Sequence, residues 1–434
     1  MRIKEKKKWL QIIGEDFIEK AFAYAHEAFD EFHRPKPAFW KMINCNRSNN
    51  EAVSKAKRSD LYETASVFPF LKLLMKMTFR WFGKDNDTVS LDDVRQIPGV
   101  DGIVGALYHI PVGEVWPLED ILDLKRQVNE KGFHLDVIES VNVHEDIKLG
   151  LSSRERYIEN YKQTIRNLAK AGVKVICYNF MPVFDWTRSD LEKKRNDGST
   201  VLAYEKDKIE NIAPEEMVRR IESDSNGFLL PGWERERLKT IQNLFALYKG
   251  VTEDDLFENL RYFLEQIIPV AEECGIKMAI HPDDPPWSVF GLPRIVTNKE
   301  NLERIIKMVD SSANGITLCS GSLGANRSND IPEIFRYFLE MDRVPFVHVR
   351  NIKIYENGDF EETSHWSCDG SLDICEIVKV LHDANFQGYI RPDHGRMIWN
   401  EKARPGYGLY DRALGVMYLL GIWDGLEKQK KGRG

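Results

Sequence analysis

Short apolar runs rich in β-branched and aromatic residues recur along the chain, and longer amphipathic stretches separate them. They predict eight strands, at residues 78–82, 102–108, 134–140, 173–180, 277–282, 315–321, 346–352 and 388–395. Residues 117–132 and 156–172 repeat apolar positions every three or four residues and end at glycine, which predicts helices. Eight strands alternating with helices favour an α/β protein with a closed (β/α)8 barrel. The alternative is an open doubly wound sheet, but no GxGxxG follows the first strand.

Residues 185–255 interrupt this alternation with a long charged stretch after the fourth predicted strand. In a barrel, such an insertion follows the carboxyl end of its strand, on the face that carries active sites. We therefore expect it to act as a lid or an oligomer contact, with a solvated loop as the plainer alternative.

Residues 1–74 stand outside the eight-strand pattern and predict a helical or irregular extension. Two pieces within residues 1–45, "IIGEDFIEKAFAYAHEA" and "RPKPAFW", resemble fragments of family-10 endo-xylanases. The segments that would carry the catalytic carboxylates of that family are missing. We expect a xylanase-like remnant without glycosidase activity, followed by a functional domain over residues 75–434 that begins at Met75 or Met77.

The amino-acid composition indicates which kind of molecule the chain binds and where it is located. The chain has 61 Lys and Arg against 68 Asp and Glu, a formal net charge of -7, which argues against nucleic acid and for a small molecule. The six cysteines form no CxxC pair, as expected of a reducing cytoplasm. No apolar stretch reaches the roughly 18 residues of a membrane span. We expect a cytoplasmic protein with no nucleic-acid or membrane partner.

Four residues with metal-ligating side chains lie at or near the ends of the last four predicted strands: His281, Cys319, His348 and Asp393. Each alone has an ordinary explanation, as a buried histidine, a small apolar cysteine or a helix cap. Strand ends converge on one pocket in a barrel, so the coincidence of all four predicts a metal site. Nitrogen, sulfur and oxygen donors together suit Mn, Fe(II), Co or Zn better than Mg or Ca.

Candidate proton carriers and substrate contacts surround this set. His394 follows Asp393 directly, and Tyr407 or Tyr410 could exchange a proton, although packing is an equal alternative for each tyrosine. The residues we predict to contact the substrate are Arg350, Asn351, Arg396, Asn179, Trp186, Arg188 and His365. His109, His144 and Asp369 are further candidates.

Several long motifs over about residues 77–425 together resemble the D-mannonate dehydratases of the xylose-isomerase-like barrel group. They include "FRWFG", "CYNFMPVFDWTR", "AIHPDDPPW", "HVRNIK", "RPDHGR" and "GYGLYDRALG". The resemblance implies dehydration of D-mannonate to 2-keto-3-deoxy-D-gluconate in glucuronate breakdown, with a Mn(II) or Fe(II) ion. It places the metal ligands on the same four residues. It places the catalytic histidine on His394 and the catalytic tyrosine on Tyr407 or Tyr410.

The chemistry of this reaction needs such groups. Removing the C2 proton of an aldonate creates a dianionic enediolate, whose charge a divalent metal would offset, and the C3 hydroxyl must be protonated to leave. Which of His394 and the tyrosine is the base stays open.

Three other functions compete with dehydration. They are a sugar isomerase or epimerase on the same barrel, a phosphodiesterase or nuclease of the same group, and a non-enzymatic binding module. We also expect a homo-oligomer, most simply a dimer.

Overall fold

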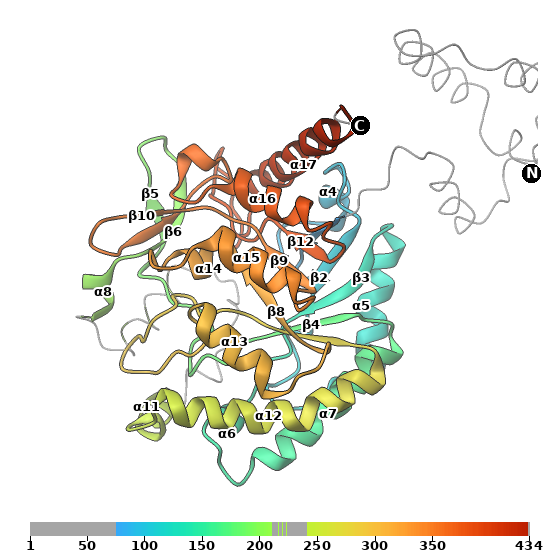
Figure 1. Cartoon of the computed structure of the whole chain (residues 1–434), viewed down its shortest axis with the longest axis vertical. Coiled ribbons are helices and arrows are strands. Elements are labelled where there is room, and N and C mark those ends of the chain that lie inside the picture. The colour runs from blue at the N-terminus through green and yellow to red at the C-terminus, as the bar shows by residue number, and fades with distance from the viewer. Residues whose placement is uncertain (1–74, 211–215, 217–218, 220–222, 224–240, 433–434) are drawn as a thin grey trace, which may run out of the picture. The chain divides into compact units, whose positions relative to one another are not determined.

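The computed structural model describes residues 75–210, 216, 219, 223 and 241–432, all within the unit Leu74–Gly434. The predicted extension over residues 1–74 lies outside the described residues. Eight parallel strands close into a barrel in the order β1-β12-β9-β8-β7-β4-β3-β2 (Figure 1). Their bounds are β1 Lys76–Arg80, β2 Gly102–Gly105, β3 His134–Glu139, β4 Val175–Tyr178, β7 Lys277–Ile280, β8 Asn314–Cys319, β9 Phe346–His348 and β12 Tyr389–Arg391. Each overlaps one predicted strand, so the predicted (β/α)8 barrel is confirmed.

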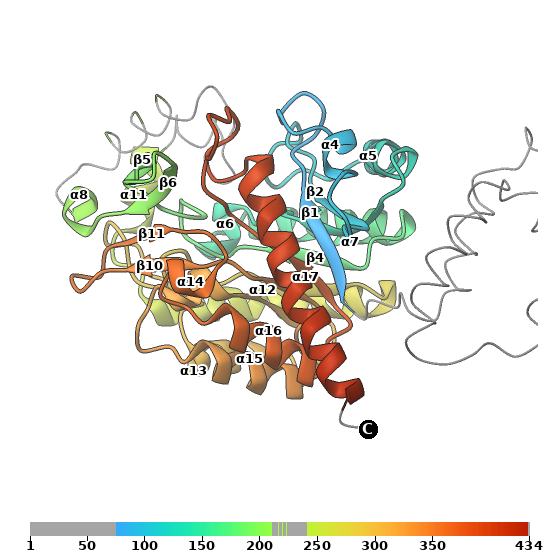
Figure 2. The ribbon, with the colours of Figure 1, turned by 90° about the horizontal axis from the view of Figure 1, so that it is seen from above.

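Helices follow the barrel strands and surround them (Figure 2). The longer ones are α5 Leu118–Glu130, α7 Arg154–Lys170, α12 Glu253–Cys274, α13 Lys299–Met308, α15 Ile331–Glu340, α16 Ile374–Asp383 and α17 Leu409–Gly432. Short helices are α4 Leu91–Val94, α6 Glu145–Lys148, α8 Lys206–Glu210, α11 Ile241–Tyr248 and α14 Ser320–Gly324. The boundaries follow local chemistry: Thr252 and Asp255 form a capping box at the start of α12, and Gly275 ends it at φ 65°. The two predicted helices correspond to α5 and α7. None of the described helices is long and apolar enough to cross a membrane.

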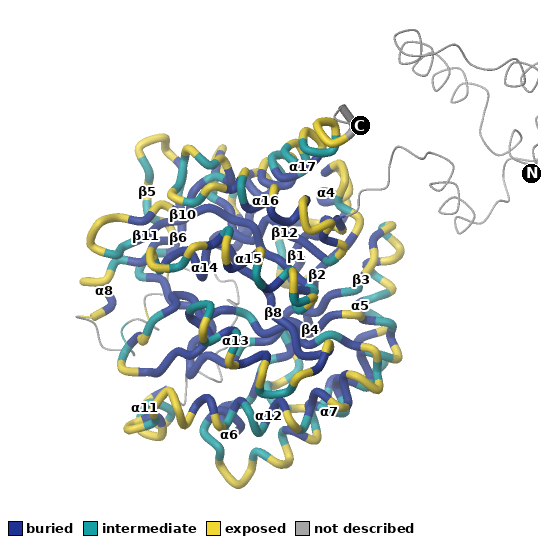
Figure 3. Tube along the Cα trace, viewed as in Figure 1, coloured by how far each residue is buried: buried dark blue, intermediate teal, exposed yellow. Residues whose placement is uncertain are grey.

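The strands bury side chains on both faces. Along β4, Val175 and Cys177 belong to the cluster inside the barrel, whereas Ile176 and Tyr178 belong to the larger core between strands and helices. Figure 3 shows the buried positions following the barrel strands and the inner sides of the helices. Both faces are therefore packed, and the strand ends form a rigid support for polar side chains.

A second sheet was not predicted. It is antiparallel, in the order β10-β11-β6-β5, with bounds β5 Asp190–Lys194, β6 Thr200–Tyr204, β10 Ile352–Ile354 and β11 Phe360–Glu362. The long insertion after the fourth barrel strand is confirmed, because β7 is the next strand of the barrel. The prediction missed that this insertion contributes β5 and β6, which pair with a hairpin formed after β9. Charged residues hide the alternating pattern of these short strands, and a contact between distant segments, such as the stacked rings of Tyr204 and Phe360, stabilises the sheet.

Candidate active site

The four predicted metal ligands meet at the carboxyl end of the barrel. His281 follows β7, Cys319 and His348 end β8 and β9, and Asp393 follows β12. His281 Nε2 lies 3.1 Å from His348 Nδ1, and the donor atoms of His281, Cys319 and His348 all lie within 4.8 Å of one another. Cys319 Sγ lies 3.6 Å from Asp393 Oδ2. Among the described residues, no other group of three or more such side chains meets the same condition.

His281 presents the correct atom for metal binding. His281 Nδ1 lies 2.7 Å from the carbonyl oxygen of Pro282, which places the ring hydrogen on Nδ1 and leaves Nε2 as the donor. Burial lowers the pKa of His281, which favours the neutral ring that a metal requires. His348 Nδ1 faces His281, and on the far side of its ring Nε2 accepts from Arg391 Nε at 3.0 Å and lies 3.5 Å from Glu139 Oε2. Two imidazoles, a thiol and a carboxylate, all buried except the partly exposed His281, fit a divalent transition metal.

Asp393 has an unusual backbone conformation, and its carboxylate contacts two arginines. Its φ of 61° lies in the left-handed region, which is uncommon for a residue other than glycine and often marks a functional site. Arg350 Nε is 2.7 Å from Oδ2, and Arg391 Nη2 is 2.8 Å from Oδ1. Burial alone would raise the pKa of this carboxyl. The nearby charges, led by Arg391, outweigh burial and hold the pKa well below its usual range.

An ion-paired layer lies directly beneath the ligands. Glu139 accepts from Arg80 at 2.8 Å and from Arg391 at 2.9 Å, and all three residues are buried. Sequence reasoning missed Glu139, Arg80 and Arg391 as site residues, although each is the last residue of a barrel strand. The strand-end rule that selected His348 would have found them if it had been applied to every strand.

His394 is the centre of a buried hydrogen-bonded chain. Its Nδ1 lies 3.2 Å from Glu362 Oε1, and its Nε2 lies 2.8 Å from the hydroxyl of Tyr407. Burial raises the pKa of Tyr407 to about 12. Tyr410, by contrast, is 43% exposed and contacts Trp399. The structure therefore brings Tyr407, and not Tyr410, to His394.

Two arginines and two carboxylates join the second sheet to the barrel. Arg188 contacts Asp284 at 2.7 Å and Glu362 at 3.0 Å, and Arg350 contacts the same carboxylates at 2.8 and 2.5 Å. Burial would raise the pKa of Glu362, but Arg350 and its other cationic neighbours outweigh it and lower the pKa to about 2. Glu362 lies on β11, so no sequence signal for it existed without knowledge of the second sheet.

Three other residues that we predicted to contact the substrate, Asn351, Trp186 and Asn179, have different environments in the structure. Asn351 binds backbone groups: its Nδ2 donates to Trp366 and its Oδ1 accepts from Ile352 and Leu372. The ring of Trp186 faces the Arg188 guanidinium at 5.8 Å. Asn179 directly follows β4 and is partly exposed.

The remaining candidates are engaged elsewhere. Arg396 pairs with Asp411 at 2.9 Å, and His365 Nε2 lies 2.6 Å from the carbonyl oxygen of Pro392. His109 pairs with Asp120 at the surface, His144 stacks on Tyr157, and Asp369 pairs with Arg195.

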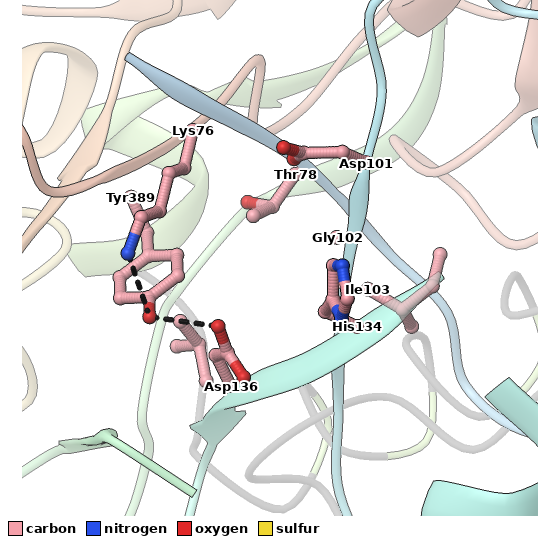
Figure 4. A pocket seen from close by; sticks show the side chains of 9 residues that line it. Lys76, Thr78, Asp101, Gly102, Ile103, His134, Asp136 and Tyr389 are labelled. Carbon is pink, nitrogen blue, oxygen red and sulfur yellow. Dashed lines mark hydrogen bonds between the residues drawn. The ribbon is translucent and has the colours of Figure 1, made fainter. Parts of the chain in front are cut away.

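A separate cavity of about 280 Å³ lies at the opposite, amino-terminal end of the barrel (Figure 4). Lys76, Gly102, His134 and Tyr389, the first residues of four barrel strands, line it. The Tyr389 hydroxyl contacts the Lys76 amino group at 3.3 Å and donates to Asp136 at 2.9 Å (Figure 4). These side chains satisfy one another, and the metal-ligating cluster lies at the other end of the strands.

Comparisons with known proteins agree with this architecture. The sequence model of the D-mannonate dehydratase (UxuA) family matches residues 75–433. A mannonate dehydratase of Geobacillus thermodenitrificans is 84% identical over 359 residues, covering 83% of this chain and 97% of that protein. One from Thermotoga neapolitana is 64% identical, covering 82% and 99%. The crystal structure of mannonate dehydratase from Streptococcus suis serotype 2 superposes with a TM-score of 0.75 at 47% identity, covering 82% of this chain and 96% of that one.

The lowered pKa of Glu362 predicts a dependence of stability on pH. The folded pKa of about 2 lies below the ordinary 4.5, so the stabilisation is complete above about pH 4.5 and is lost as the pH falls toward 2. A shift of this size corresponds to about 3 kcal/mol. Glu362→Gln should therefore lower the midpoint of thermal unfolding strongly at pH 7, and the difference from wild type should shrink between pH 4.5 and 3.

Glu356→Gln, at an exposed carboxylate six residues earlier, is the matched control and should change the midpoint little at any pH. A difference between Glu362→Gln and wild type that stays constant from pH 7 to pH 3 would contradict the electrostatic account.

Proposed function

The chain belongs to the D-mannonate dehydratase family, and from that premise we propose how its residues carry out the reaction. The activity is the dehydration of D-mannonate to 2-keto-3-deoxy-D-gluconate in hexuronate breakdown, which makes the protein a metal-dependent hydro-lyase. One observation carries the assignment of residues. The group His281, Cys319 and His348 adjoins Asp393, whose Oδ1 lies 3.8 Å from Nε2 of His394, the partner of Tyr407.

The metal would be held by His281 Nε2, Cys319 Sγ, His348 Nδ1 and Asp393. We propose Mn(II) or Fe(II), because the donor set mixes sulfur, nitrogen and oxygen and the site must stay open to a carboxylate substrate. When bound, such an ion supplies Lewis-acid stabilisation of the negative charge that develops on the substrate oxygens.

His394 is the proposed base. The carboxylate of Glu362 can only accept a hydrogen, so the ring hydrogen of His394 lies on Nδ1 and the lone pair on Nε2. This nitrogen accepts the phenol hydrogen of Tyr407 when no substrate intervenes. With D-mannonate bound, the same lone pair would remove the C2 proton. Glu362 fixes the tautomer without touching the substrate and is therefore a positioning residue.

Tyr407 is the proposed acid. Its pKa of about 12 keeps the phenol protonated at neutral pH, so it has a hydrogen to donate to the departing C3 hydroxyl. The distance of 2.8 Å between His394 Nε2 and the Tyr407 hydroxyl suits proton exchange at two adjacent carbons. The C2 proton passes to His394, and the C3 hydroxyl leaves as water with the proton of Tyr407, which leaves an enol. Transfer of the proton from His394 to C3 and of the enol hydroxyl proton to the Tyr407 phenolate gives the 2-keto-3-deoxy acid and restores both side chains.

Arg350 and Arg188 have a supporting role in this proposal. Both are buried, and their guanidinium groups are occupied by Asp284 and Glu362. We assign them to holding the carboxylates of the site, and direct substrate contact to the partly exposed Asn179 and to Trp186. The expected homodimer and the cytoplasmic location stay predictions.

We further propose that residues 75–434 carry the whole activity. The family match begins at residue 75 and accounts for nearly the full length of the relatives. A chain that begins at Met75 should therefore have the turnover and thermal midpoint of the 434-residue chain. Turnover and thermal unfolding of the two purified chains are measured at equal metal content. A loss of turnover on removing residues 1–74 would assign them a part in the reaction.

The roles of the two proton carriers can be separated by isotope exchange. His394→Asn should abolish both dehydration and exchange of the C2 hydrogen with solvent deuterium. Tyr407→Phe should lower kcat by about 10²–10⁴-fold while leaving some C2 exchange, because only expulsion of the hydroxyl is impaired. Both are measured by proton NMR of D-mannonate in deuterated buffer.

Tyr410→Phe is the matched control for the tyrosine and should retain wild-type turnover. If turnover falls strongly in Tyr410→Phe and little in Tyr407→Phe, the acid is Tyr410 and not Tyr407.

The metal assignment predicts a selective response to reconstitution. Protein stripped with a chelator should regain dehydration with Mn(II) or Fe(II) and much less with Mg(II), because thiolate and imidazole are poor ligands for Mg(II). Cys319→Ala should bind the ion more weakly and lose turnover. Full activity after stripping, or in Cys319→Ala, would remove the sulfur from the proposed metal site.

A further inference from the structure

Cys319 Sγ receives two hydrogen-bond donors from one residue. The hydroxyl of Ser322 lies 3.1 Å from the sulfur, and the backbone N–H of Ser322 lies 3.4 Å from it. Cys319 and Ser322 are both 0% exposed, so water does not compete for these contacts. A hydroxyl fixed against a metal-ligating sulfur is the kind of neighbour that orients a ligand and adjusts its donor strength.

Two acceptors compete for the single hydroxyl hydrogen. Ser322 Oγ lies 3.1 Å from Cys319 Sγ and 3.2 Å from Asp284 Oδ2. Asp284 is already well supplied, because Arg188 donates to both of its oxygens and Arg350 donates to Oδ2 at 2.8 Å. The sulfur has no arginine donor among the hydrogen bonds of the described residues. Because Asp284 already accepts from two arginines, we expect the hydroxyl hydrogen of Ser322 to point to the sulfur.

Arg350 fixes the orientation of the hydroxyl. Its Nη2 donates to Ser322 Oγ at 3.2 Å, which occupies one lone pair and turns the hydroxyl hydrogen away from the arginine. The fit is close, since a Cβ on Gly321 would lie 2.4 Å from Arg350 Cζ. Arg350 Nε also contacts Asp393. One arginine thus supports both anionic ligands, Asp393 directly and Cys319 through Ser322.

We propose that Ser322 is a positioning residue of the metal site, whose hydroxyl donates to the Cys319 thiolate and sets the strength of the metal–sulfur bond. This inference rests on the proposed metal site and adds a residue to it. Removing the hydroxyl leaves the sulfur with only the backbone N–H of Ser322, so the ligand is oriented less firmly. The sulfur also becomes more electron-rich, which affects the charge-transfer band, whereas the loss of orientation affects the affinity. The metal should then bind more weakly, by the 10–100-fold that is typical when a residue supporting a ligand is removed.

Cobalt(II) is the probe, because a thiolate bound to it gives a sulfur-to-metal charge-transfer band in the near ultraviolet. The metal-stripped 434-residue chain and its Ser322→Ala variant are titrated with Co(II) in competition with a chelator of known affinity. We expect about 10–100-fold weaker binding in Ser322→Ala. We also expect the band to move to lower energy, since a sulfur without its hydrogen bond is easier to oxidise.

Ser320→Ala is the matched control. Ser320 is as buried as Ser322, but its hydroxyl binds only the backbone of Arg350, donating to the carbonyl oxygen at 2.6 Å and accepting from the N–H at 2.9 Å. Its charge-transfer band should match that of the wild type. A band shift confined to Ser322→Ala supports the hydrogen bond to sulfur, because a general loss of packing would not select between the two serines.

Three other results would overturn the inference. If Ser322→Ala keeps the wild-type affinity and band, the hydroxyl does not act on the sulfur, while the proposed metal site stands. If both serine variants shift the band equally, the effect comes from packing around Arg350. Absence of any thiolate band in the wild type would overturn the proposed metal site together with this inference.

Discussion

The pairing of buried carboxylates with buried arginines is the constraint on which the rest of this site depends. Four carboxylates lie at the carboxyl end of the barrel, and four arginines lie between them: Glu139, Asp284, Glu362 and Asp393, with Arg80, Arg188, Arg350 and Arg391. An isolated charge in such surroundings is expensive, and breaking one buried pair typically costs about 3–5 kcal/mol. The carboxylates therefore stay ionised, and each side chain is held in one position before any substrate arrives.

This network also explains why the second sheet matters to the barrel. Glu362 comes from β11, yet it contacts Arg188, Arg350 and the ring of His394. The sheet thereby fixes the tautomer of the proposed base from outside the barrel. The ligands come from strand ends and the orienting carboxylate from the hairpin after β9, which pairs with the insertion through β6, so catalytic geometry depends on both parts folding together.

The sequence predicted the barrel because its signal is local and repeated: each buried strand is an apolar run of a few residues, and each helix has its own period. It predicted that the four candidate ligands would meet because parallel strands place their ends together, and that rule needs only the position of each run. It left Tyr407 and Tyr410 equivalent, since both lie in one glycine-rich segment and only the fold shows that one is buried against His394. The second sheet and Glu362 depend on contacts between distant segments, which no local pattern reports. Ser322 lies only three residues after Cys319, but its sequence position alone does not show that its hydroxyl faces the sulfur.

The central claim is that one cluster of four ligands, with His394 and Tyr407 beside it, is where D-mannonate reacts. The most direct measurement is a crystal structure of the Tyr407→Phe variant with Mn(II) and D-mannonate, with the metal located by its anomalous scattering. The account predicts one anomalous peak bound by His281, Cys319, His348 and Asp393. It also predicts that C2 of the substrate faces His394 Nε2 and that the C3 hydroxyl faces residue 407. A metal bound by other residues, or a substrate whose C2 lies away from His394, would contradict it.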